Sequence, residues 1–558
     1  MTRRLSCLSL VILFAMTANT QAQQTRPPSL SGRSTVYAPR GAIATSQPLA
    51  TAAGLAVLGA GGNAIDAAVA AAAVLNVVEP HMTGIGGDLF ALFWSARENK
   101  LIGLDASGRA GALMTREELI RRGRDGMPGR GAEAITVPGA LSGWSALLAE
   151  YGSVTLAEAL GPAIRIAEEG FPVTPIIAGQ WAAEVDKLSA NEGASQTYLV
   201  GGVRAPQAGE WFSNPDLAAT FRLIADQGPA VFYGGALGQR VVDGVQLLGG
   251  FLTLEDLATH RPEWVEPISA DYRGYRVWEL PPSGQGVAAL EMLRILQPFA
   301  LKSMGHNSPE YLHHLIEAKK LAYADLARYV ADRDHMTIST DELLSDEFID
   351  ARRSLLDPSR AADRPSPGPA VTSSETIYLS VADRDGNMVS FINSVYSAFG
   401  SGVVVPGTGF ALQNRGGGFT LEADHPNMVA PGKRPFHTII PAFVTKDNGN
   451  GHEPWLSYGV MGGSMQPQGH VQVLLNLVLF DMDLQDAVDA GRFRHMGGRR
   501  IALETPITDE VRQALEAMGH EIVDETSVSF GGSQAVMRLP RGWAAASDPR
   551  KDGMAAGH

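Results

Sequence analysis

The sequence contains a single cysteine among its 558 residues, and that cysteine, Cys7, lies within the first ten positions. If the N-terminal segment is removed, the remaining chain has no thiol, which excludes disulfide bonds and cysteine-based catalysis. Its stability must then come from a buried core. With 45% hydrophobic and 19% charged residues, the chain has a globular composition, and it is long enough to bury a large core.

Basic residues are also scarce. The 45 lysines and arginines stand against 59 acidic residues, which gives a net charge of −14 at pH 7. Nucleic acids and anionic membranes bind through basic patches, so neither is expected as the main partner. The sequence also lacks a His-Glu-x-x-His motif, cysteine pairs, a Gly-x-Ser-x-Gly elbow and a Walker loop. We therefore expect no metal and no other cofactor.

The first 22 residues have the pattern of a secretory signal peptide. Arg3 and Arg4 precede an apolar run from Leu8 to Met16, and small residues near Ala22 offer a cleavage site. The apolar run is short for a permanent transmembrane anchor, and no later stretch resembles one. We therefore expect residues 1–22 to be removed and the protein to be periplasmic or secreted, without a membrane anchor.

Residues 357–375 interrupt the pattern of the chain. Helix-period segments dominate residues 115–350, whereas 357–375 is rich in proline, serine and alanine and has no apolar period, which is typical of a mobile surface loop. Thr376 then begins a run of alternating apolar and polar residues. A turn containing Asp-Gly connects it to a second run that ends at Val395, so the two runs predict a β-hairpin.

A threonine that directly follows an accessible loop is a candidate nucleophile. If the peptide bond between Glu375 and Thr376 is cut, the new α-amine has a pKa of about 8 and can act as the base for its own hydroxyl. Taken alone, the local pattern favours an ordinary threonine at the start of a strand. Gly462 and Gly463, between a predicted strand and a predicted helix, can present backbone amides to an oxyanion, or can form a simple tight turn.

Several polar residues near these segments are candidates for substrate binding. Ser394 and Tyr396 lie at the end of the predicted hairpin. Arg109 or Arg415 is suited to bind a substrate carboxylate bidentately, although each alone is more often a surface or structural arginine. His437, followed by Thr438, is a candidate polar contact, although a lone histidine is more often a packed residue.

Motifs in the same order along nearly the whole chain resemble those of the gamma-glutamyltranspeptidase family of N-terminal-nucleophile hydrolases. The matching stretches are Glu79–Gly87, Thr136–Gly139, Thr376–Asn387, Phe399–Gly402, Lys433–Pro435 and Gly462–Gly463. The resemblance implies an α+β fold, a four-layer αββα sandwich. It also implies a precursor that cleaves itself into a large subunit, residues 23–375, and a small subunit, 376–558. The two remain associated as a heterodimer that forms one intertwined catalytic domain, without a cofactor.

The resemblance also implies roles for individual residues. Thr376 matches the family's nucleophile, Ser394 matches a hydroxyl beside it, and Gly462 and Gly463 match the glycines whose amides form the oxyanion hole. The family transfers the gamma-glutamyl group of glutathione and similar amides to water or to an amino acid through an acyl-enzyme. We therefore expect a gamma-glutamyltransferase or glutathione hydrolase, with a small-molecule amide such as glutathione as its substrate.

The residues that hold the glutamyl group in the family are mostly different here. Tyr396 stands at an asparagine position, Arg415 replaces a glutamine, Gly418 replaces an aspartate, and His437-Thr438 replaces a serine pair. Arg109 comes about two positions later than the family's arginine. An added arginine and a lost aspartate leave a cationic α-amine without a carboxylate partner, which is unfavourable in a buried site.

This pattern resembles the branch of the family that includes oxamate amidohydrolase and acylase-like members. An alternative function is therefore the hydrolysis of a carboxylate-bearing amide that is not a glutamyl amide, such as an oxamate-like compound or a dicarboxylic monoamide. An alternative from another class is a non-catalytic periplasmic binding protein with the same fold. An intact Thr376 and an intact glycine pair argue against it, because a binding protein has no use for a cleavable loop.

Overall fold

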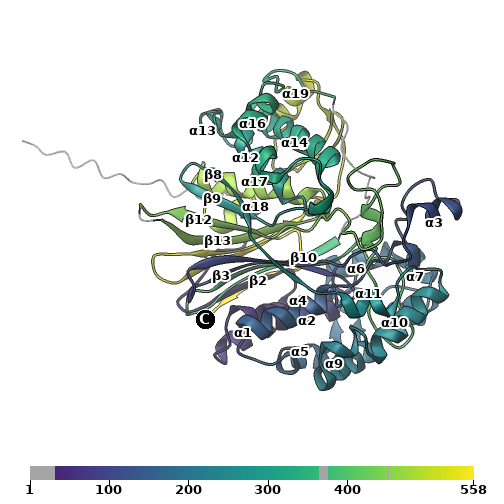
Figure 1. Ribbon diagram of the computed structural model, residues 1–558. Helices are drawn as coiled ribbons and strands as arrows, with labels where there is room; N and C mark the ends of the chain where they lie inside the picture. The colour runs from purple at the N-terminus through teal and green to yellow at the C-terminus, as the bar shows by residue number, and fades with distance from the viewer. Residues whose placement is uncertain (1–31, 364–374, 450) are drawn as a thin grey trace, which may run out of the picture.

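The computed structural model describes residues 32–363, 375–449 and 451–558. These residues form four layers, in which two seven-stranded sheets face each other and helices cover the outer face of each sheet (Figure 1). The four-layer αββα sandwich is thus confirmed. The expected signal peptide, 1–22, and residues 364–374 of the expected loop lie outside the described residues.

The sheet that contains Thr376 is antiparallel throughout and has the order β19-β2-β10-β11-β3-β4-β7. Strands from both sides of Thr376 alternate in it, so a cut before Thr376 would leave the two parts hydrogen-bonded to each other. Its strands are β2 (Ala42–Thr45), β3 (Asp88–Ser95), β4 (Lys100–Ala106), β7 (Glu263–Val265), β10 (Glu375–Ala382), β11 (Met388–Tyr396) and β19 (Met554–Gly557).

The facing sheet is also antiparallel and has the order β1-β18-β17-β13-β12-β9-β8. Its strands are β1 (Val36–Ala38), β8 (Ile268–Tyr272), β9 (Tyr275–Glu279), β12 (Ala442–Asp447), β13 (His452–Met461), β17 (Gly532–Arg538) and β18 (Trp543–Ser547). Two small sheets contain β5 (Phe171–Pro172) with β6 (Trp211–Phe212), and β14 (Phe493–Gly497), β15 (Arg500–Leu503) and β16 (Glu521–Ile522).

The helices divide between the two outer faces (Figure 1). Beside the sheet of β10 lie α1 (Pro48–Gly59), α2 (Ala64–Val78), α4 (Ala140–Tyr151), α5 (Leu156–Glu169), α6 (Pro175–Ala182), α7 (Val185–Ser189), α8 (Glu192–Tyr198), α9 (Pro215–Gln227), α10 (Ala236–Leu247) and α11 (Leu254–Thr259), with α3 (Arg116–Arg121) at the edge. Beside the sheet of β13 lie α12 (Gly286–Leu296), α13 (Leu301–Met304), α14 (Pro309–Tyr329), α15 (Thr340–Leu343), α16 (Asp346–Arg353), α17 (Met465–Val478), α18 (Leu484–Asp489) and α19 (Asp509–Ala517). None of the helices in the described ranges combines the length and apolar character needed to cross a bilayer.

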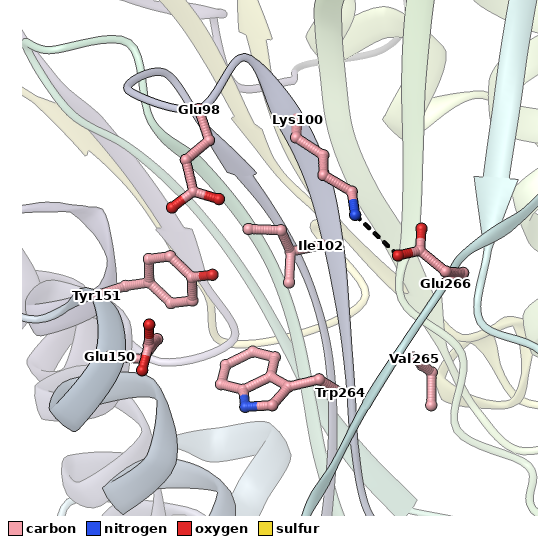
Figure 2. Close-up of a pocket in the computed structure, with 8 residues that line it drawn as sticks. All are labelled: Glu98, Lys100, Ile102, Glu150, Tyr151, Trp264, Val265 and Glu266. Atoms are coloured by element: carbon pink, nitrogen blue, oxygen red, sulfur yellow. Dashed lines mark hydrogen bonds and ion pairs between the residues drawn. The ribbon is translucent and has the colours of Figure 1, made fainter.

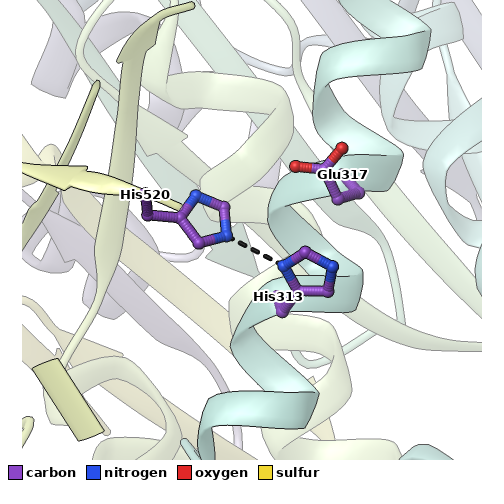
Figure 3. A group of neighbouring side chains, drawn as sticks. All are labelled: His313, Glu317 and His520. Carbon is purple, nitrogen blue, oxygen red and sulfur yellow. Dashed lines mark hydrogen bonds between the residues drawn. The ribbon is translucent and has the colours of Figure 1, made fainter. Parts of the chain in front are cut away.

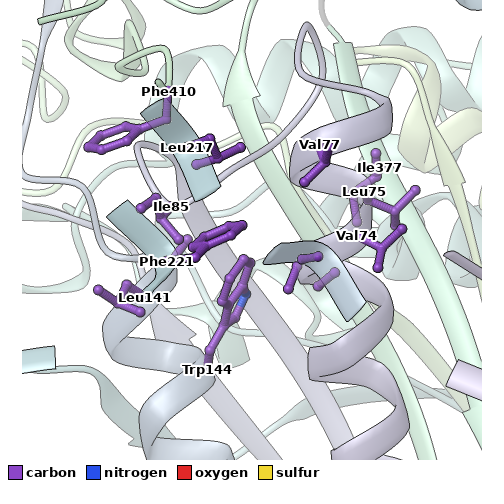
Figure 4. Close-up of a cluster of buried hydrophobic side chains, with 14 of the residues drawn as sticks. Val74, Leu75, Val77, Ile85, Leu141, Trp144, Leu217, Phe221, Ile377 and Phe410 are labelled. Carbon is purple, nitrogen blue, oxygen red and sulfur yellow. The ribbon is translucent and has the colours of Figure 1, made fainter. Parts of the chain in front are cut away.

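Helix α2 supports the strand that begins near Thr376. Asn63 caps it in a capping box with Asp66, and all 15 of its residues are buried because the sequence is apolar nearly all round. Figure 4 shows side chains of α2 beside Ile377 of β10, with Trp144 of α4 in the same cluster. Helix α2 therefore fixes the position of β10 from the outer side.

The predicted hairpin is confirmed as β10 and β11, joined at the Asp-Gly turn. Ile377, Leu379 and Val381 pack into the core beneath α2, while Tyr378 joins the core between the two sheets. The alternation in the sequence therefore predicted correctly which side chains face which layer.

The start of the expected mobile loop is partly anchored. Residues 357–363 contain no helix or strand, but the backbone amide of Ala361 donates to the carbonyl oxygen of Met518 at 2.8 Å. Proline and serine content alone did not reveal this contact, because it depends on a segment more than 150 residues away in the chain.

Candidate active site

Thr376 lies at the start of β10 and is almost completely buried, with 1% of its surface exposed. Glu375 pairs with Tyr396, but Ile377 pairs with Asn393, so the register shifts at Thr376. A β-bulge of this kind redirects a side chain relative to the regular alternation of a strand. The bulge therefore sets the direction of the Thr376 hydroxyl at the end of the strand.

The Thr376 hydroxyl is connected to β11 by hydrogen bonds. Its Oγ1 donates to Ser394 Oγ at 3.1 Å, and Ser394 Oγ accepts the backbone amide of Tyr396 at 2.8 Å. Ser394 is fully buried. The structure thus brings together Thr376, Ser394 and Tyr396, three residues that the sequence analysis selected.

The two sheets approach closely beside Thr376. Ser380 Oγ on β10 donates to the carbonyl oxygen of Ser457 on β13 at 2.9 Å. Tyr378, two residues nearer the start of β10, lies against Gly459, where an added Cβ would be 2.5 Å from the tyrosine ring. Residue 380 of β10 thus lies against residue 457 of β13, and residue 378 lies against residue 459. The facing positions therefore move two residues toward the start of β10 for every two residues toward the end of β13.

The same progression leads from Thr376 to the glycine pair. The next step along β10 is Thr376, and the next step along β13 is Met461, its last residue, which Gly462 and Gly463 follow directly. The two glycines therefore lie at the end of the interface where the predicted nucleophile begins its strand.

Gly462 and Gly463 turn the chain from β13 into α17. Their φ angles are 115° and 57°, in the left-handed region that favours glycine. Their carbonyl oxygens accept the amides of Met465 and Gln466 at 2.9 and 3.1 Å. Within the part of the chain that the structure describes, neither glycine amide donates a hydrogen bond of its own. Two adjacent free amides at a helix N-terminus are suited to hold an oxyanion.

A charged cluster lies beside the hydroxyl pair. Asp88 is opposite Ser394 in the pairing of β3 with β11. Its Oδ2 lies 3.6 Å from Arg415 Nε and 3.4 Å from His437 Nε2, and all three side chains are fully buried. Arg415 Nη1 donates to Thr438 Oγ1 at 3.0 Å. The cluster therefore joins Arg415, His437 and Thr438, which are distant in sequence.

Tyr396 connects the two groups of residues. Its backbone amide belongs to the Thr376 network, and its ring lies under the Arg415 guanidinium at 4.3 Å from the ring centre. A cation over an aromatic face gains electrostatic stabilisation, more so when both are desolvated. Tyr396 thus holds the guanidinium in place from one side.

The charge state of the cluster follows from burial. Burial lowers the pKa of His437 to about 4, with the nearby Arg415 cation acting in the same direction and Asp88 opposing it. His437 is therefore neutral at neutral pH. Burial also lowers the pKa of Arg415, opposed by Asp88, but a guanidinium starts so high that it remains charged.

Much of the hydrogen-bonding capacity of this cluster is unused. Five buried side-chain atoms have no hydrogen-bond partner among the described residues; they are Asp88 Oδ2, Arg415 Nε and Nη2, and His437 Nδ1 and Nε2. Three of the five, Asp88 Oδ2, Arg415 Nε and His437 Nε2, still face one another at 3.4–3.6 Å, so Arg415 Nη2 and His437 Nδ1 are the groups left for a ligand or an ordered water to contact.

Arg109, a predicted carboxylate ligand, is placed differently, and the structure explains the glycine at position 418. Arg109 lies in ion pairs with Glu263 at 3.0 Å and Asp332 at 3.2 Å, and among the described residues no hydrogen bond or ion pair joins it to the Arg415 cluster. At Gly418, an added Cβ would lie 2.6 Å from the carbonyl oxygen of Phe436. The aspartate that the family has there would not fit this backbone, which accounts for the glycine.

The sequence analysis selected neither Asp88 nor Gln285, whose Nε2 donates to the carbonyl oxygens of Thr438 and Gly463. Asp88 directly follows the glycine-rich stretch 83–87, where an added Cβ on Gly87 would lie 2.3 Å from the carbonyl oxygen of Ser394. The glycines permit that close approach, and they bring Asp88 to the site. The position of Asp88 directly after this stretch could have indicated that it belongs to the site. Nothing in the local sequence distinguished Gln285 in this way.

One group of side chains has the composition of a metal site. His313 and Glu317 on α14 and His520 after α19 each place a nitrogen or oxygen atom within 4.8 Å of the others (Figure 3). However, His313 already contacts His520 at 2.9 Å and the carbonyl oxygen of Asp357 at 2.8 Å, and Glu317 forms a buried ion pair with Lys320 at 2.8 Å. A divalent ion there would lie close to the lysine cation, which is unfavourable. We therefore interpret the group as a set of hydrogen bonds that anchors the segment beginning at Asp357.

A surface pocket of about 380 Å³ lies elsewhere, lined by Glu98, Lys100, Ile102, Glu150, Tyr151, Trp264, Val265 and Glu266 (Figure 2). Lys100 and Glu266 close one side with an ion pair of 2.8 Å. Lys100 pairs with Ser95, at the opposite end of β3 from Asp88. The pocket is therefore separate from the candidate active site.

The fold and the central strand define a class: a four-layer αββα sandwich of the N-terminal-nucleophile hydrolase type, with a threonine at the start of a central strand. Residues 50–558 match the family model described as Gamma-glutamyltranspeptidase. The chain therefore belongs to the gamma-glutamyltranspeptidase family.

Individual relatives differ in the substrates that their names give. The chain is 37% identical over 520 residues to the glutathione hydrolase-like YwrD proenzyme of Bacillus subtilis (strain 168), which covers 91% of this chain and 97% of that protein. It is 36% identical over 524 residues to the oxamate amidohydrolase proenzyme of Klebsiella pneumoniae, with coverage of 91% and 97%. The crystal structure of cephalosporin acylase from Bacillus halodurans is 45% identical, with a TM-score of 0.89 over 96% of this chain and 98% of that chain.

Proposed function

We propose that the chain cleaves itself between Glu375 and Thr376 and then hydrolyses an amide through an acyl-enzyme on Thr376. In the first reaction, Thr376 Oγ1 attacks the carbonyl carbon of Glu375, the peptide bond breaks, and an ester forms. Water then hydrolyses that ester, which leaves a carboxylate on Glu375 and a free α-amine on Thr376. The hydrogen-bonded position of the hydroxyl beside Ser394 and the word proenzyme in the names of relatives support this proposal.

In turnover, the α-amine of Thr376 takes the proton of its own hydroxyl as Oγ1 attacks the substrate carbonyl. Ser394 holds the hydroxyl in place, and the amides of Gly462 and Gly463 stabilise the negative charge that develops on the carbonyl oxygen. The α-amine then gives the proton to the leaving amine. Water, or an amino acid in a transfer reaction, attacks the acyl ester and releases Thr376.

The substrate that the site fits best is an amide whose acyl part carries a carboxylate and needs no α-amine. The observation that carries this assignment is Arg415, a fully buried guanidinium whose Nη2 has no hydrogen-bond partner among the described residues. A carboxylate supplies the missing acceptor and can bind the planar guanidinium through two oxygens. Thr438, Tyr396 and His437 line the same position.

An α-ammonium group lacks an equivalent partner. Asp88 is the carboxylate in contact with Arg415, so that guanidinium already balances its negative charge, although its Oδ2 accepts no hydrogen bond among the described residues. Gly418 leaves no room for a second carboxylate on the same backbone. Oxamate-like compounds and dicarboxylic monoamides therefore fit the charges better than a gamma-glutamyl amide. Glutathione, named for several relatives, is the second candidate because the proposed catalytic residues serve it equally.

The proposed self-cleavage has a direct test. The purified full chain is run on a denaturing gel, and the smaller band is sequenced from its N-terminus. The expected sequence begins Thr-Ile-Tyr-Leu. A single uncut chain, or a small band that begins elsewhere, would contradict self-cleavage and would favour the binding-protein alternative. Release of ammonia from oxamate and from glutaric acid monoamide, set against hydrolysis of glutathione, then tests the substrate class.

We also propose that residues 1–22 export the protein to the periplasm or the medium and that the two subunits remain associated after cleavage. The strands of both sheets support the second point, because they come from both sides of Thr376. Mass spectrometry of the large subunit purified from cell fractions tests both points. Recovery of an intact N-terminus from the cytoplasm would contradict export.

A further inference from the structure

The connection between β9 and α12 passes beside two segments of the candidate site. Residues 283–285 run parallel to His437, where the amide of His437 donates to the carbonyl oxygen of Ser283 at 2.9 Å and the amide of Gln285 donates to the carbonyl oxygen of His437 at 3.1 Å. Gln285 then precedes the first residue of α12, and only 1% of its surface is exposed.

The Gln285 side chain bridges these segments. Its Nε2 donates to the carbonyl oxygen of Thr438 at 2.5 Å and to the carbonyl oxygen of Gly463 at 2.8 Å. One amide nitrogen therefore uses both of its N–H groups on backbone oxygens. The Thr438 oxygen belongs to the segment that contacts Arg415, and the Gly463 oxygen belongs to the glycine pair.

We propose that Gln285 is a positioning residue that fixes the Gly462–Gly463 turn, and thereby its free amides, relative to Thr376. The proposal rests on the proposed function for its catalytic meaning. The two glycines have φ angles in the left-handed region, and glycine backbones rotate more freely than others. Oxyanion donors must lie within about 2.7–3.1 Å of the oxyanion, so a small rotation of these peptide planes reduces catalysis.

The same nitrogen also holds the segment of Thr438, which contacts Arg415. Thr438 Oγ1 accepts a hydrogen bond from Arg415 Nη1 at 3.0 Å, so the backbone position of Thr438 affects the guanidinium. The segment has a second link to the glycine turn, because the Ile440 amide donates to Gln466 Oε1 at 3.0 Å. Gln285 is therefore one of two side chains in the described ranges that join the segment of Thr438 to the glycine turn, and it is the one that contacts Gly463 itself.

The chemistry of this position is specific to a primary amide. A glutamate would place negative charge against two carbonyl oxygens, and a methionine of similar length would leave both oxygens without this donor. An asparagine keeps the two N–H groups but is one methylene shorter. The three substitutions thus separate charge, hydrogen bonding and reach.

The test compares Gln285→Met with a matched control, Gln472→Met. Gln472 on α17 is also buried and also donates from Nε2 to two backbone oxygens, those of Gln468 and Phe493, at 2.9 and 3.2 Å. Hydrolysis of glutaryl-p-nitroanilide gives kcat and KM for the processed enzymes. Hydrogen–deuterium exchange of peptides that cover residues 461–466 reports on the turn directly.

For Gln285→Met we expect kcat to fall about 10–100-fold with KM changed less than about threefold, and exchange in 461–466 to become faster. For Gln472→Met we expect kcat within about twofold of the wild type and unchanged exchange in 461–466. If Gln285→Met does not fold, Gln285→Asn is measured in its place, with the same expectations.

Unchanged exchange in 461–466 in the Gln285 variant would overturn the proposal, whatever the activity. An equal loss of kcat in both variants would also overturn it, because the effect would then be a general loss of packing. If the wild type neither cleaves itself nor hydrolyses the anilide, the proposed function fails. Faster exchange would in that case still support Gln285 as the residue that holds the turn.

Discussion

Two neighbouring parts of the candidate site differ in how completely their polar groups are satisfied. Around Thr376, neutral groups contact one another: the threonine hydroxyl, Ser394 Oγ and the Tyr396 amide form a continuous set of hydrogen bonds. Around Arg415, the Asp88 carboxylate lies 3.6 Å from the guanidinium and 3.4 Å from the neutral His437 ring, and five buried atoms have no hydrogen-bond partner in the described part of the chain.

The difference indicates separate roles. A satisfied network holds its members in one geometry, as a nucleophile requires. An unsatisfied buried group raises the free energy of the folded state, and a ligand that supplies the missing partner recovers that free energy on binding. These features support the proposal that the first part carries out the reaction and that the second part binds the substrate.

The largest effect is expected at the nucleophile. Thr376→Ala removes the hydroxyl that attacks in both reactions, so self-cleavage and turnover should each fall by about 10⁴-fold or more. A denaturing gel after prolonged incubation and an amide hydrolysis assay measure the two effects. Cleavage of the variant at the wild-type rate would show that a residue other than Thr376 is the nucleophile. The hydrogen-bonded group around Thr376 would then not be the catalytic part of the site.

A smaller effect is expected at the guanidinium. Arg415→Gln introduces the family's residue and removes a charge-assisted contact, so kcat/KM for a carboxylate-bearing amide should fall about 10–100-fold while self-cleavage continues. Arg109→Gln is the matched variant, because Arg109 was the other predicted carboxylate ligand and is paired with Glu263 and Asp332. A larger loss for Arg109→Gln than for Arg415→Gln would reassign the recognition site.

Ser394→Ala tests the satisfied network itself. The variant removes the acceptor of the Thr376 hydroxyl and of the Tyr396 amide, so kcat should fall about 10-fold with KM little changed. Steady-state kinetics on the processed variant measure this. A change in KM alone would indicate that Ser394 belongs to the recognition part and not to the catalytic part.

The smallest effect concerns pH and stability. Burial holds the pKa of His437 at about 4, below its usual value of 6.5, so the unfolded chain binds a proton first as the pH falls. The stability due to the neutral ring is complete above pH 6.5 and is lost as the pH falls toward 4, by about 1.4 kcal/mol per pH unit and about 3 kcal/mol in total.

His437→Gln should therefore reduce the decrease in unfolding free energy between pH 6.5 and 4, as measured by urea unfolding. Other buried histidines contribute in the same direction, because burial also lowers the pKa values of His260 and His470. His335→Gln, at an exposed histidine, is the control for the substitution itself, and its comparison with His437→Gln isolates the contribution of the buried ring. An unchanged slope in His437→Gln would contradict a neutral buried ring.

Much of the fold was predictable, because periodicity and capping act locally. Asn63 marks the start of α2, and the alternation in 376–382 assigns each side chain of β10 to its layer. The same holds for α9, Pro215–Gln227, which lies in the stretch 115–350 where helix-period segments dominate. The family motifs supplied the order of the layers, which local patterns do not contain.

The candidate site was only partly predictable. Thr376, Ser394 and Tyr396 lie on one hairpin, so their proximity follows from strand pairing. The environment of Arg415 depends on Asp88, which lies more than 300 residues earlier in the chain, and on Gln285, whose amide acts on two distant backbone oxygens. Such contacts follow from tertiary structure, and no spacing rule in the sequence predicts them.

The central claim is that the catalytic part is retained whereas recognition has shifted to a carboxylate without an α-amine. Glutaryl-p-nitroanilide and γ-glutamyl-p-nitroanilide differ only in the α-amine, so the ratio of their kcat/KM values on the processed enzyme tests the claim directly. We predict that the ratio favours the glutaryl compound by about 10-fold or more, because a buried ammonium beside Arg415 lacks a carboxylate partner. A ratio that favours the γ-glutamyl compound would contradict the account.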